Sequence, residues 1–303
     1  MALTILTNQS ASAPALSGTI GALIAVLDFC LVTTLGWTKP YSGANLAAYK
    51  QPVGSNGMYL YVDDTAAQNA RVSAYEVMTS ISAGTGNFPT TGQIAGGGYI
   101  YKSFTANSTA RPWYFASDGK MFHLFIAQSG TTPAAFGNGV ALYSFGDFVS
   151  YKSGDVFNTY TAVDTAATSG AAGNASSSAF NGATSGHYVA RPHTQVGTSL
   201  NVSRFSDYSG QAGGTGYFGN GAVPYPNPID GGINVARIFV GDPTVGRRGR
   251  IPGLWAWQHP SNLLNSGDTF NGAGDLAGRS FIFFQNSTVT SAMVLETSDT
   301  WST

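Results

Sequence analysis

The chain has 303 residues, of which 43% are hydrophobic and only 10% are charged, and its formal net charge is −1. An average soluble domain has roughly 25% charged residues, so the charged surface that keeps a free protein soluble is largely missing. The near-neutral balance excludes a general electrostatic attraction to nucleic acid or acidic lipid, because the only basic run, Arg247, Arg248 and Arg250, is short.

The composition is typical of a β-protein. Aromatic residues make up 13% of the chain, and the strong helix former Glu occurs only as Glu76 and Glu296. We predict a mainly β fold, an antiparallel sandwich or barrel-like sheets, with one N-terminal helix and long Gly/Ser/Ala-rich loops. Scarce charge also suits large permanent interfaces, whose cores are depleted of charged residues. A secreted β-protein is the alternative class with the same composition.

The first part of the chain predicts neither a signal peptide nor membrane insertion. Residues 1–14 have no basic region, and the apolar stretch 20–32 contains Asp28 and is too short to cross a bilayer. Cys30 is the single cysteine, so no intramolecular disulfide can form. This usage fits synthesis in a reducing cytoplasm.

Residues 1–52 are predicted to hold the helix and an aromatic loop, a candidate assembly arm. Ser17 is the expected N-cap of a helix that reaches Val32. One face of this helix is apolar, because hydrophobic residues recur at spacings of three and four: Leu23, Val26, Leu27, Cys30 and Leu31. Pro40 and Gly43 favour an irregular loop over residues 37–50.

Residues 53–163 are predicted to form a β region. Strands are expected at 58–62, 70–78, 99–101 and 140–149. The clearest signal is a hairpin over residues 113–126, because Asp118-Gly119 favours the positive φ values that a tight primed turn requires.

Residues 164–186 are almost wholly Ala, Ser, Thr, Gly and Asn, which predicts a flexible low-complexity loop. Residues 211–221 are similar. A second β region is expected over 187–303, packed with the first as one domain. Its strands are predicted near 186–191, 198–204, 232–240, 281–285 and 292–296. No internal repeat is evident, which disfavours a propeller or a β-helix.

Residues that could carry chemistry are scattered. His123 lies inside a predicted strand, where a structural role is favoured over that of a base. The other histidines, His187, His193 and His259, lack a metal-binding spacing. Cys30 lies on the apolar helix face, which favours packing over a nucleophilic role. Most Asp residues stand beside Gly, Asn or Ser, so turn formation is favoured over the paired carboxylates of a glycosidase. We predict no catalytic residue, no metal and no cofactor, and hence no enzyme.

Aromatic and arginine clusters are the candidate contact residues. Trp, Tyr and Arg carry most of the energy of protein contacts, which favours core or interface anchors here. Sugar stacking is the alternative. The candidates are Trp37, Tyr41, Trp113, Trp255, Trp257, Arg248 and Arg250.

Several longer stretches resemble one family of proteins. They include Gly36-Trp-Thr-Lys-Pro-Tyr-Ser-Gly-Ala-Asn and Arg248-Gly-Arg-Ile-Pro-Gly-Leu-Trp, together with residues 18–31, 57–64, 145–155, 225–232 and 296–301. Together they resemble a family of uncharacterised virion structural proteins of tailed bacteriophages, over nearly the whole chain. This chain is shorter than the family pattern between Val32 and Gly36. The resemblance implies a virion component made in the bacterial cytoplasm, with other phage structural proteins as partners, and it supplies no catalytic residue.

The expected function is therefore an accessory component of the tail or baseplate that acts by protein–protein packing, as a homo-oligomer. A head decoration protein is one alternative, because the sequence does not decide between head and tail. A host-surface glycan-binding module, with Trp113, Trp255 and Trp257 as stacking platforms, is the second. An enzyme such as a depolymerase is the third. Direct nucleic-acid binding is not expected.

Overall fold

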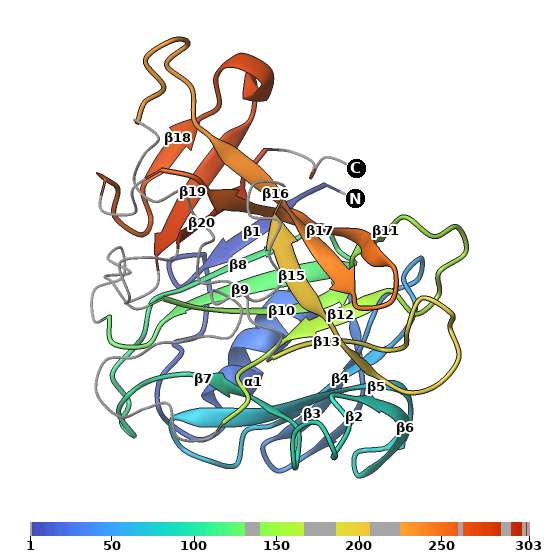
Figure 1. Cartoon of the computed structure of the whole chain (residues 1–303). Helices are drawn as coiled ribbons and strands as arrows, with labels where there is room; N and C mark the ends of the chain where they lie inside the picture. The colour runs from blue at the N-terminus through green and yellow to red at the C-terminus, as the bar shows by residue number, and fades with distance from the viewer. Residues whose placement is uncertain are drawn as a thin grey trace.

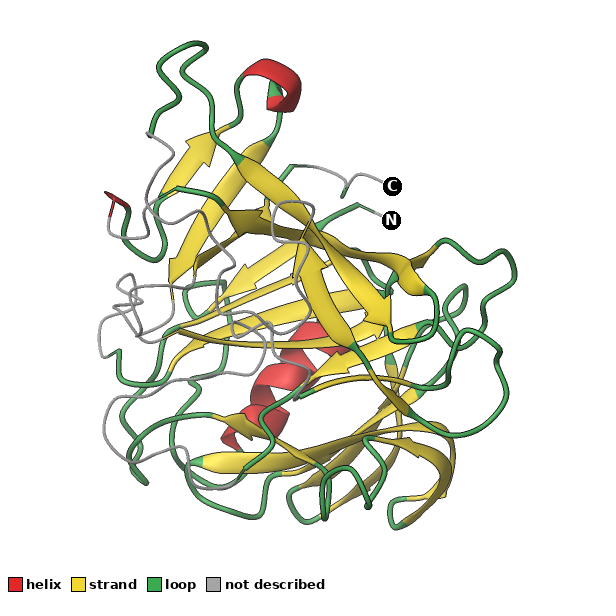
Figure 2. Ribbon diagram, viewed as in Figure 1, coloured by secondary structure: helices red, strands yellow, loops and turns green. Residues whose placement is uncertain are grey.

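The computed structural model describes residues 2–130, 140–166, 186–206, 225–259, 263–285, 292–298 and 301. These residues form three antiparallel β-sheets stacked in layers, with one N-terminal helix between two of the layers (Figures 1 and 2). The predicted mainly β, antiparallel architecture with a single helix near the N-terminus is confirmed. Neither the helix nor the shorter helical turns of the described residues are long and apolar enough to cross a membrane.

The middle sheet lies between the other two. Its strands are, in spatial order, β1 (Thr4–Thr7), β8 (Trp113–Ser117), β9 (Met121–Ala127), β10 (Val140–Asp147), β12 (Thr159–Ala162), β13 (His187–Val189) and β14 (Leu200–Asn201).

The upper sheet lies at the top of Figure 1. Its strands are, in spatial order, β15 (Ser203–Ser206), β16 (Val235–Asp242), β17 (Gly246–Trp257), β20 (Ala292–Glu296), β19 (Ser280–Gln285) and β18 (Thr269–Asn271). The short strand β11 (Val149–Ser150) also pairs with β17, and the 3₁₀ turn η3 (Gly274–Leu276) lies between β18 and β19.

The lower sheet contains β2 (Thr38–Gly43), β3 (Leu46–Lys50), β4 (Tyr59–Asp63), β5 (Asn69–Ser80) and β6 (Ala83–Phe88), and β7 (Gly98–Tyr101) pairs with β5. The expected irregular loop over 37–50 is wrong, because β2 and β3 form a hairpin there. Pro40 is tolerated because the β2–β3 ladder shifts register between Thr38 and Tyr41, and Gly43 pairs with Leu46 at the end of the hairpin. The expected boundary at 52/53 falls within this sheet, since β3 pairs with β4.

The middle sheet is buried on both faces. Trp113, Phe115 and Leu124 pack with the helix and the lower sheet. The opposite face, which includes Phe125, packs against the upper sheet. The rings of Phe125 and Phe284 stack with centroids 3.9 Å apart across this second interface. Burying each such ring contributes about 1.5–3 kcal/mol. Every residue of β9 is therefore buried, and its sequence is apolar on both faces, except for His123, instead of alternating.

The helix consists of α1 (Ala22–Leu27) followed directly by a π-helical segment, η1 (Asp28–Thr34). Its predicted apolar face is buried in the core, Cys30 included. Ser17 is not the N-cap, because the helix begins at Ala22 and Ser17 Oγ instead lies 2.8 Å from Thr19 Oγ1.

The helix N-terminus is capped from outside by Asp64. Its Oδ2 accepts hydrogen bonds from the backbone N–H of Leu23 at 2.8 Å and of Ile24 at 3.3 Å. Its other oxygen pairs with Lys102 Nζ, and both side chains are fully buried. Burial raises the pKa of Asp64 and Lys102 opposes that rise. The pair ties the helix to the end of β4.

The predicted hairpin over 113–126 is confirmed as β8 and β9. Its turn is not a primed one, because of the two turn residues only Gly119 has a positive φ, 92°. The Asp118 carboxylate instead accepts the backbone N–H groups of Lys120 and Met121 at 2.9 and 2.8 Å. The predicted low-complexity loop falls mostly, over 167–185, outside the described residues, and 211–221 falls wholly outside them.

Candidate functional site

Three of the predicted contact residues belong to the core. Trp113 and Trp257 have no exposed surface, and Trp37 is 2% exposed. Trp37 Nε1 donates to the carbonyl of Gly119 at 3.1 Å, and Trp113 Nε1 donates to that of Pro14 at 3.2 Å. These three tryptophans are core residues, so their selection as contact residues was wrong. None offers a free ring face for a sugar or a partner.

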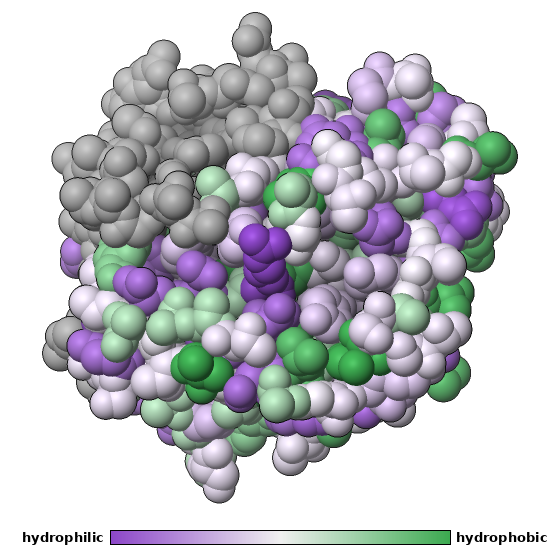
Figure 3. Space-filling view, turned by 90° about the horizontal axis from the view of Figure 1, so that it is seen from below, coloured by the Kyte–Doolittle hydropathy of each residue, from purple (hydrophilic) through white to green (hydrophobic). Residues whose placement is uncertain are grey.

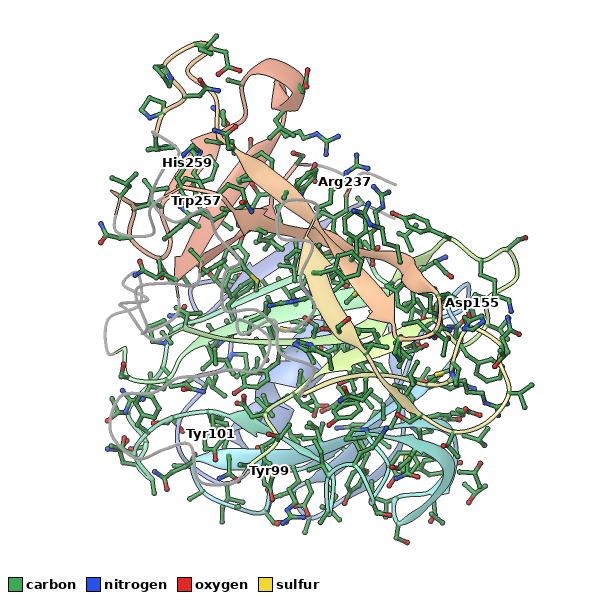
Figure 4. The ribbon with its side chains drawn as sticks, in the orientation of Figure 1. Tyr99, Tyr101, Asp155, Arg237, Trp257 and His259 are labelled. Carbon is green, nitrogen blue, oxygen red and sulfur yellow. The ribbon has the colours of Figure 1, made fainter. Side chains whose placement is uncertain are left out.

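Arg248 is also internal. It is 2% exposed, and its guanidinium forms two-atom contacts with the Asp155 carboxylate at 3.0–3.2 Å. The guanidinium further donates to the carbonyl of Arg191. Asp155 lies in the loop after β11, so this pair attaches that loop to strand β17. Figure 4 shows Asp155 at the edge of the molecule. Arg248 is thus corrected from a contact residue to a structural one.

Trp255 and Arg250 lie on the outer face of the upper sheet. Trp255 is 7% exposed, and the guanidinium groups of Arg237 and Arg279 each lie 5.6 Å from its ring centroid. Its indole N–H donates to Glu296 Oε2 at 3.2 Å. The arginines cover the ring, so Trp255 is not an open stacking platform.

Tyr41 belongs to an aromatic surface that the sequence indicated only in part. Its hydroxyl donates to the carbonyl of Met78 at 3.1 Å, and its ring stacks on Tyr59 with centroids 6.4 Å apart. Tyr61 and Tyr75 meet edge to face, also at 6.4 Å. We call these four residues, on the side of the lower sheet that faces away from the helix, the tyrosine face.

Strand register explains why the tyrosines converge. Side chains on paired residues of neighbouring strands point to the same side of a sheet. One row across the lower sheet is Lys50, Tyr59, Tyr75 and Asn87, and the adjacent row is Tyr41, Ala48, Tyr61 and Ser73. The alternation Tyr59-Leu60-Tyr61 was the signal available in the sequence. No local pattern indicated that Tyr59 pairs with Tyr75 on the next strand.

The tyrosine face is partly shielded from water. Tyr41, Tyr61 and Tyr75 are half-buried and cover a small apolar cluster separate from the core. Burial raises the pKa of Tyr75, and burial with the nearby Asp63 raises that of Tyr61. Seen from below, this side of the molecule mixes apolar and weakly polar residues with isolated strongly hydrophilic ones (Figure 3). The face is amphipathic, as protein contact surfaces are.

A polar cleft of about 530 Å³ lies between the turn after β8 and the loops around residues 54–56 and 150–158. Asp118, Asp147 and Asp155 line it with Lys120 and Lys152. Burial raises the pKa of Asp118 and of Asp147.

The carboxylates of the cleft are engaged in structural hydrogen bonds. Asp147 Oδ1 accepts from Gln51 at 2.9 Å and Thr159 at 2.6 Å, and its Oδ2 accepts from the Asn56 N–H at 2.8 Å. Asp118 holds its own turn and Asp155 holds Arg248. Asp118 and Asp155 thus have the turn role expected from the sequence, whereas Asp147 ends strand β10 and holds a loop that is distant in sequence.

The four histidines also have structural partners: Ser144 and Pro252 for His123, Tyr160 for His187, Asp242 for His193, and Asn234 for His259. His123 is fully buried. In Figure 4, His259 lies beside Trp257, and their ring centroids are 4.7 Å apart. Among the described residues, no group of three or more His, Cys, Asp or Glu side chains is placed to hold a metal ion.

Comparison with known proteins assigns no relative. No protein-family model matches the chain, and no curated protein matches it at a significant level.

Proposed function

We propose that this chain is a structural component of a bacteriophage particle, an accessory tail or baseplate subunit that acts by packing against other protein chains and not by catalysis. The tyrosine face carries the proposal. It presents large, half-buried aromatic side chains on a rigid antiparallel sheet, the kind of residue that anchors protein contacts.

The charges near the tyrosine face support the same proposal. Lys50, in the same row as Tyr59, has its Nζ 5.4 Å from the Tyr59 ring centroid, so this cation already contacts the aromatic surface. Glu76 and Lys39 instead pair with Arg191, which follows β13, and with Asp28 of the helix, at 2.5–2.6 Å. These two side chains therefore point away from the tyrosine face.

The buried charges give further support. Among the residues that the structure describes, nine charged ones are buried: Asp64, Lys102, Arg111, Asp164, Arg204, Asp242, Arg248, Arg250 and Glu296. Charged side chains are rarely buried in free soluble proteins. The surface therefore carries even less charge than the 10% composition indicates, which suits a subunit that is surrounded by others.

A head decoration protein stays the alternative, because a tyrosine-rich sheet face could pack against capsid proteins as well as against tail proteins. The glycan-binding alternative has lost support, since Trp113 and Trp257 are buried and Trp255 is covered by arginines.

The proposal is tested in purified particles of the phage that encodes the chain. We expect quantitative mass spectrometry to find it in stoichiometric copies. In phage carrying Tyr61→Ser with Tyr75→Ser, incorporation should fall at least about tenfold, because two interface anchors are worth about 1–2 kcal/mol each. Tyr151→Ser, at an exposed position outside the lower sheet, is the matched control and should incorporate normally. Absence of the chain from wild-type particles contradicts the proposal.

A further inference from the structure

A hollow on the upper sheet arises from an irregularity in the β16–β17 ladder. Arg237 pairs with Trp255 and Phe239 pairs with Arg250, so residues 251–254 of β17 stand opposite the single residue Ile238. This wide bulge interrupts the ladder. Residues 250–255 and Arg237 line the hollow, which we call the arginine pocket.

Arg250 is the unusual member of the pocket. It is 6% exposed and lines the hollow, yet within the described residues its guanidinium has no hydrogen-bond or ion-pair partner. Residues with so little exposure rarely carry an unpaired charge, and the guanidinium nitrogens of Arg250 are still reached by solvent through the hollow. By contrast, Arg248, two residues earlier on the same strand, is fully paired with Asp155.

The neighbours of Arg250 add positive charge. Arg237 is exposed, and its described contact is with the Trp255 ring. Figure 4 shows it on the upper sheet, on the side away from the middle sheet. Arg279 pairs with the Glu296 carboxylate at 3.1 Å. Within the part of the chain that the structure describes, three guanidinium groups lie near this carboxylate, and burial together with Arg237 and Arg279 lowers the pKa of Arg250.

The chemistry of the pocket selects its ligand. An excess of guanidinium groups repels cations and favours an oxyanion, and a planar carboxylate matches the fork of a guanidinium. The hollow is small, and Trp255 lies beneath two arginines, so it offers no open ring face on which a sugar could stack. The free volume of the hollow is only about 10 Å³, so a ligand contacts the guanidinium groups at its open mouth. A single carboxylate on a flexible side chain can reach them there.

We propose that the arginine pocket binds a carboxylate, supplied by an acidic side chain of a neighbouring protein subunit. That the carboxylate belongs to a neighbouring protein subunit rests on the proposed function. The carboxylate-binding site itself does not. Arg250 supplies the buried contact and Arg237 the exposed one.

The test uses the isolated full-length protein and NMR of its arginine Nε–H and tryptophan indole signals. Blocked glutamate (N-acetyl-glutamate amide), methyl glucuronide and inorganic phosphate are titrated separately against sodium chloride at equal ionic strength. We expect blocked glutamate to give saturable shifts at Arg250, Arg237 and Trp255. Arg250→Gln should weaken this binding at least about tenfold. Arg71→Gln, an exposed arginine on the lower sheet, is the control and should bind as the wild type does.

If Arg250→Gln does not fold, Arg237→Gln and Arg250→Lys answer the same question, and each should weaken binding. Equal shifts with chloride, or unchanged binding by the Arg variants, would overturn the carboxylate site. Tighter binding of methyl glucuronide than of blocked glutamate would show that the carboxylate comes from an acidic sugar and not from a protein. Tighter binding of phosphate than of blocked glutamate would show that the ligand is not a carboxylate.

The two proposals fail separately. Binding of blocked glutamate by a chain that is absent from particles would contradict only the proposed function. A chain present in particles without carboxylate binding would contradict only the pocket.

Discussion

The imidazole Nε2 of His123 lies 2.8 Å from the carbonyl oxygen of Pro252, and this contact joins the middle sheet to the bulge of the upper sheet. A carbonyl can only accept, so Nε2 carries the proton, and Nδ1, 2.8 Å from Ser144 Oγ, accepts from that hydroxyl. The bulge that holds Pro252 also forms the arginine pocket. The position of the pocket is therefore fixed by a buried inter-sheet hydrogen bond.

His123 should make the protein sensitive to acid. Burial lowers its pKa from 6.5 to about 4, so the unfolded chain takes up the proton first as the pH falls. The stabilising contribution of neutral His123 is complete above about pH 6.5 and is lost progressively down to about pH 4, at a cost of about 3 kcal/mol. Denaturant unfolding at pH 7.5, 5.5 and 4.5 measures this loss.

The His123→Gln variant separates this effect from other titrations. The pKa values of Asp118 and Asp147 are raised, so those carboxyls act in the opposite direction. We expect His123→Gln to be less stable than the wild type at pH 7.5 but to lose less stability on acidification. Equal acid sensitivity in His123→Gln and the wild type would contradict this assignment.

The buried pair of Lys102 and Asp64 should be intolerant of single substitutions. Lys102→Met leaves the Asp64 carboxylate buried without its cation, and we expect a loss of about 3–5 kcal/mol in the free energy of unfolding. Lys39→Met, in a pair that is about a third exposed, should cost less than about 1 kcal/mol.

A double variant checks the cause. Lys102→Met with Asp64→Asn removes both charges and should recover part of the loss, as measured by urea unfolding. Equal losses in the free energy of unfolding for Lys102→Met and Lys39→Met would contradict a larger contribution from the buried pair.

Gly253 should be required by the bulge. Its φ is +73°, and a Cβ added there would lie 2.2 Å from Trp301 Cε2. Gly246 has a similar φ of +77° with no atom within 4 Å of such a Cβ. Thermal unfolding should show a loss of about 1 kcal/mol for Gly246→Ala, from backbone strain alone. Gly253→Ala should lose about 1–3 kcal/mol more, because Trp301 must move; equal losses would contradict the packing described here.

Cys30 should be inert in the folded protein. It lies within η1 with no exposed surface, and burial raises the pKa of its thiol well above the ordinary value. Because the thiolate is the reactive form, we expect no reaction with Ellman's reagent at pH 8 in native buffer and one thiol per chain in guanidinium. Rapid labelling of the native protein would show that the helix opens readily.

Local patterns predicted the elements whose signals are local. The hairpin over 113–126 and the apolar helix face were visible because turn residues and spacing specify them directly. The strand β17 was missed because Gly249, Pro252 and Gly253 interrupt any alternation, and its pairing with β16 absorbs them in a bulge. The hairpin of β2 and β3 was missed for the same reason, since Pro40 lies at its register shift.

The candidate site depended on long-range register. Trp113, Trp257 and Arg248 were chosen as contact residues from residue type and local clustering. The double burial of the middle sheet encloses Trp113, the aromatic cluster of the upper sheet encloses Trp257, and the pairing with Asp155 holds Arg248 inside. Tyr75 joins Tyr59 only through the pairing of β4 with β5. Likewise, Asp64 caps a helix 40 residues away in sequence, and no local pattern indicates that contact.

A cryo-electron microscopy map of the intact phage particle tests the central claim most directly. The account predicts that this chain occupies a defined symmetric position, with the tyrosine face at Tyr61 and Tyr75 buried against another protein chain. A particle without the chain, or one in which that face of every copy is open to solvent, would contradict it.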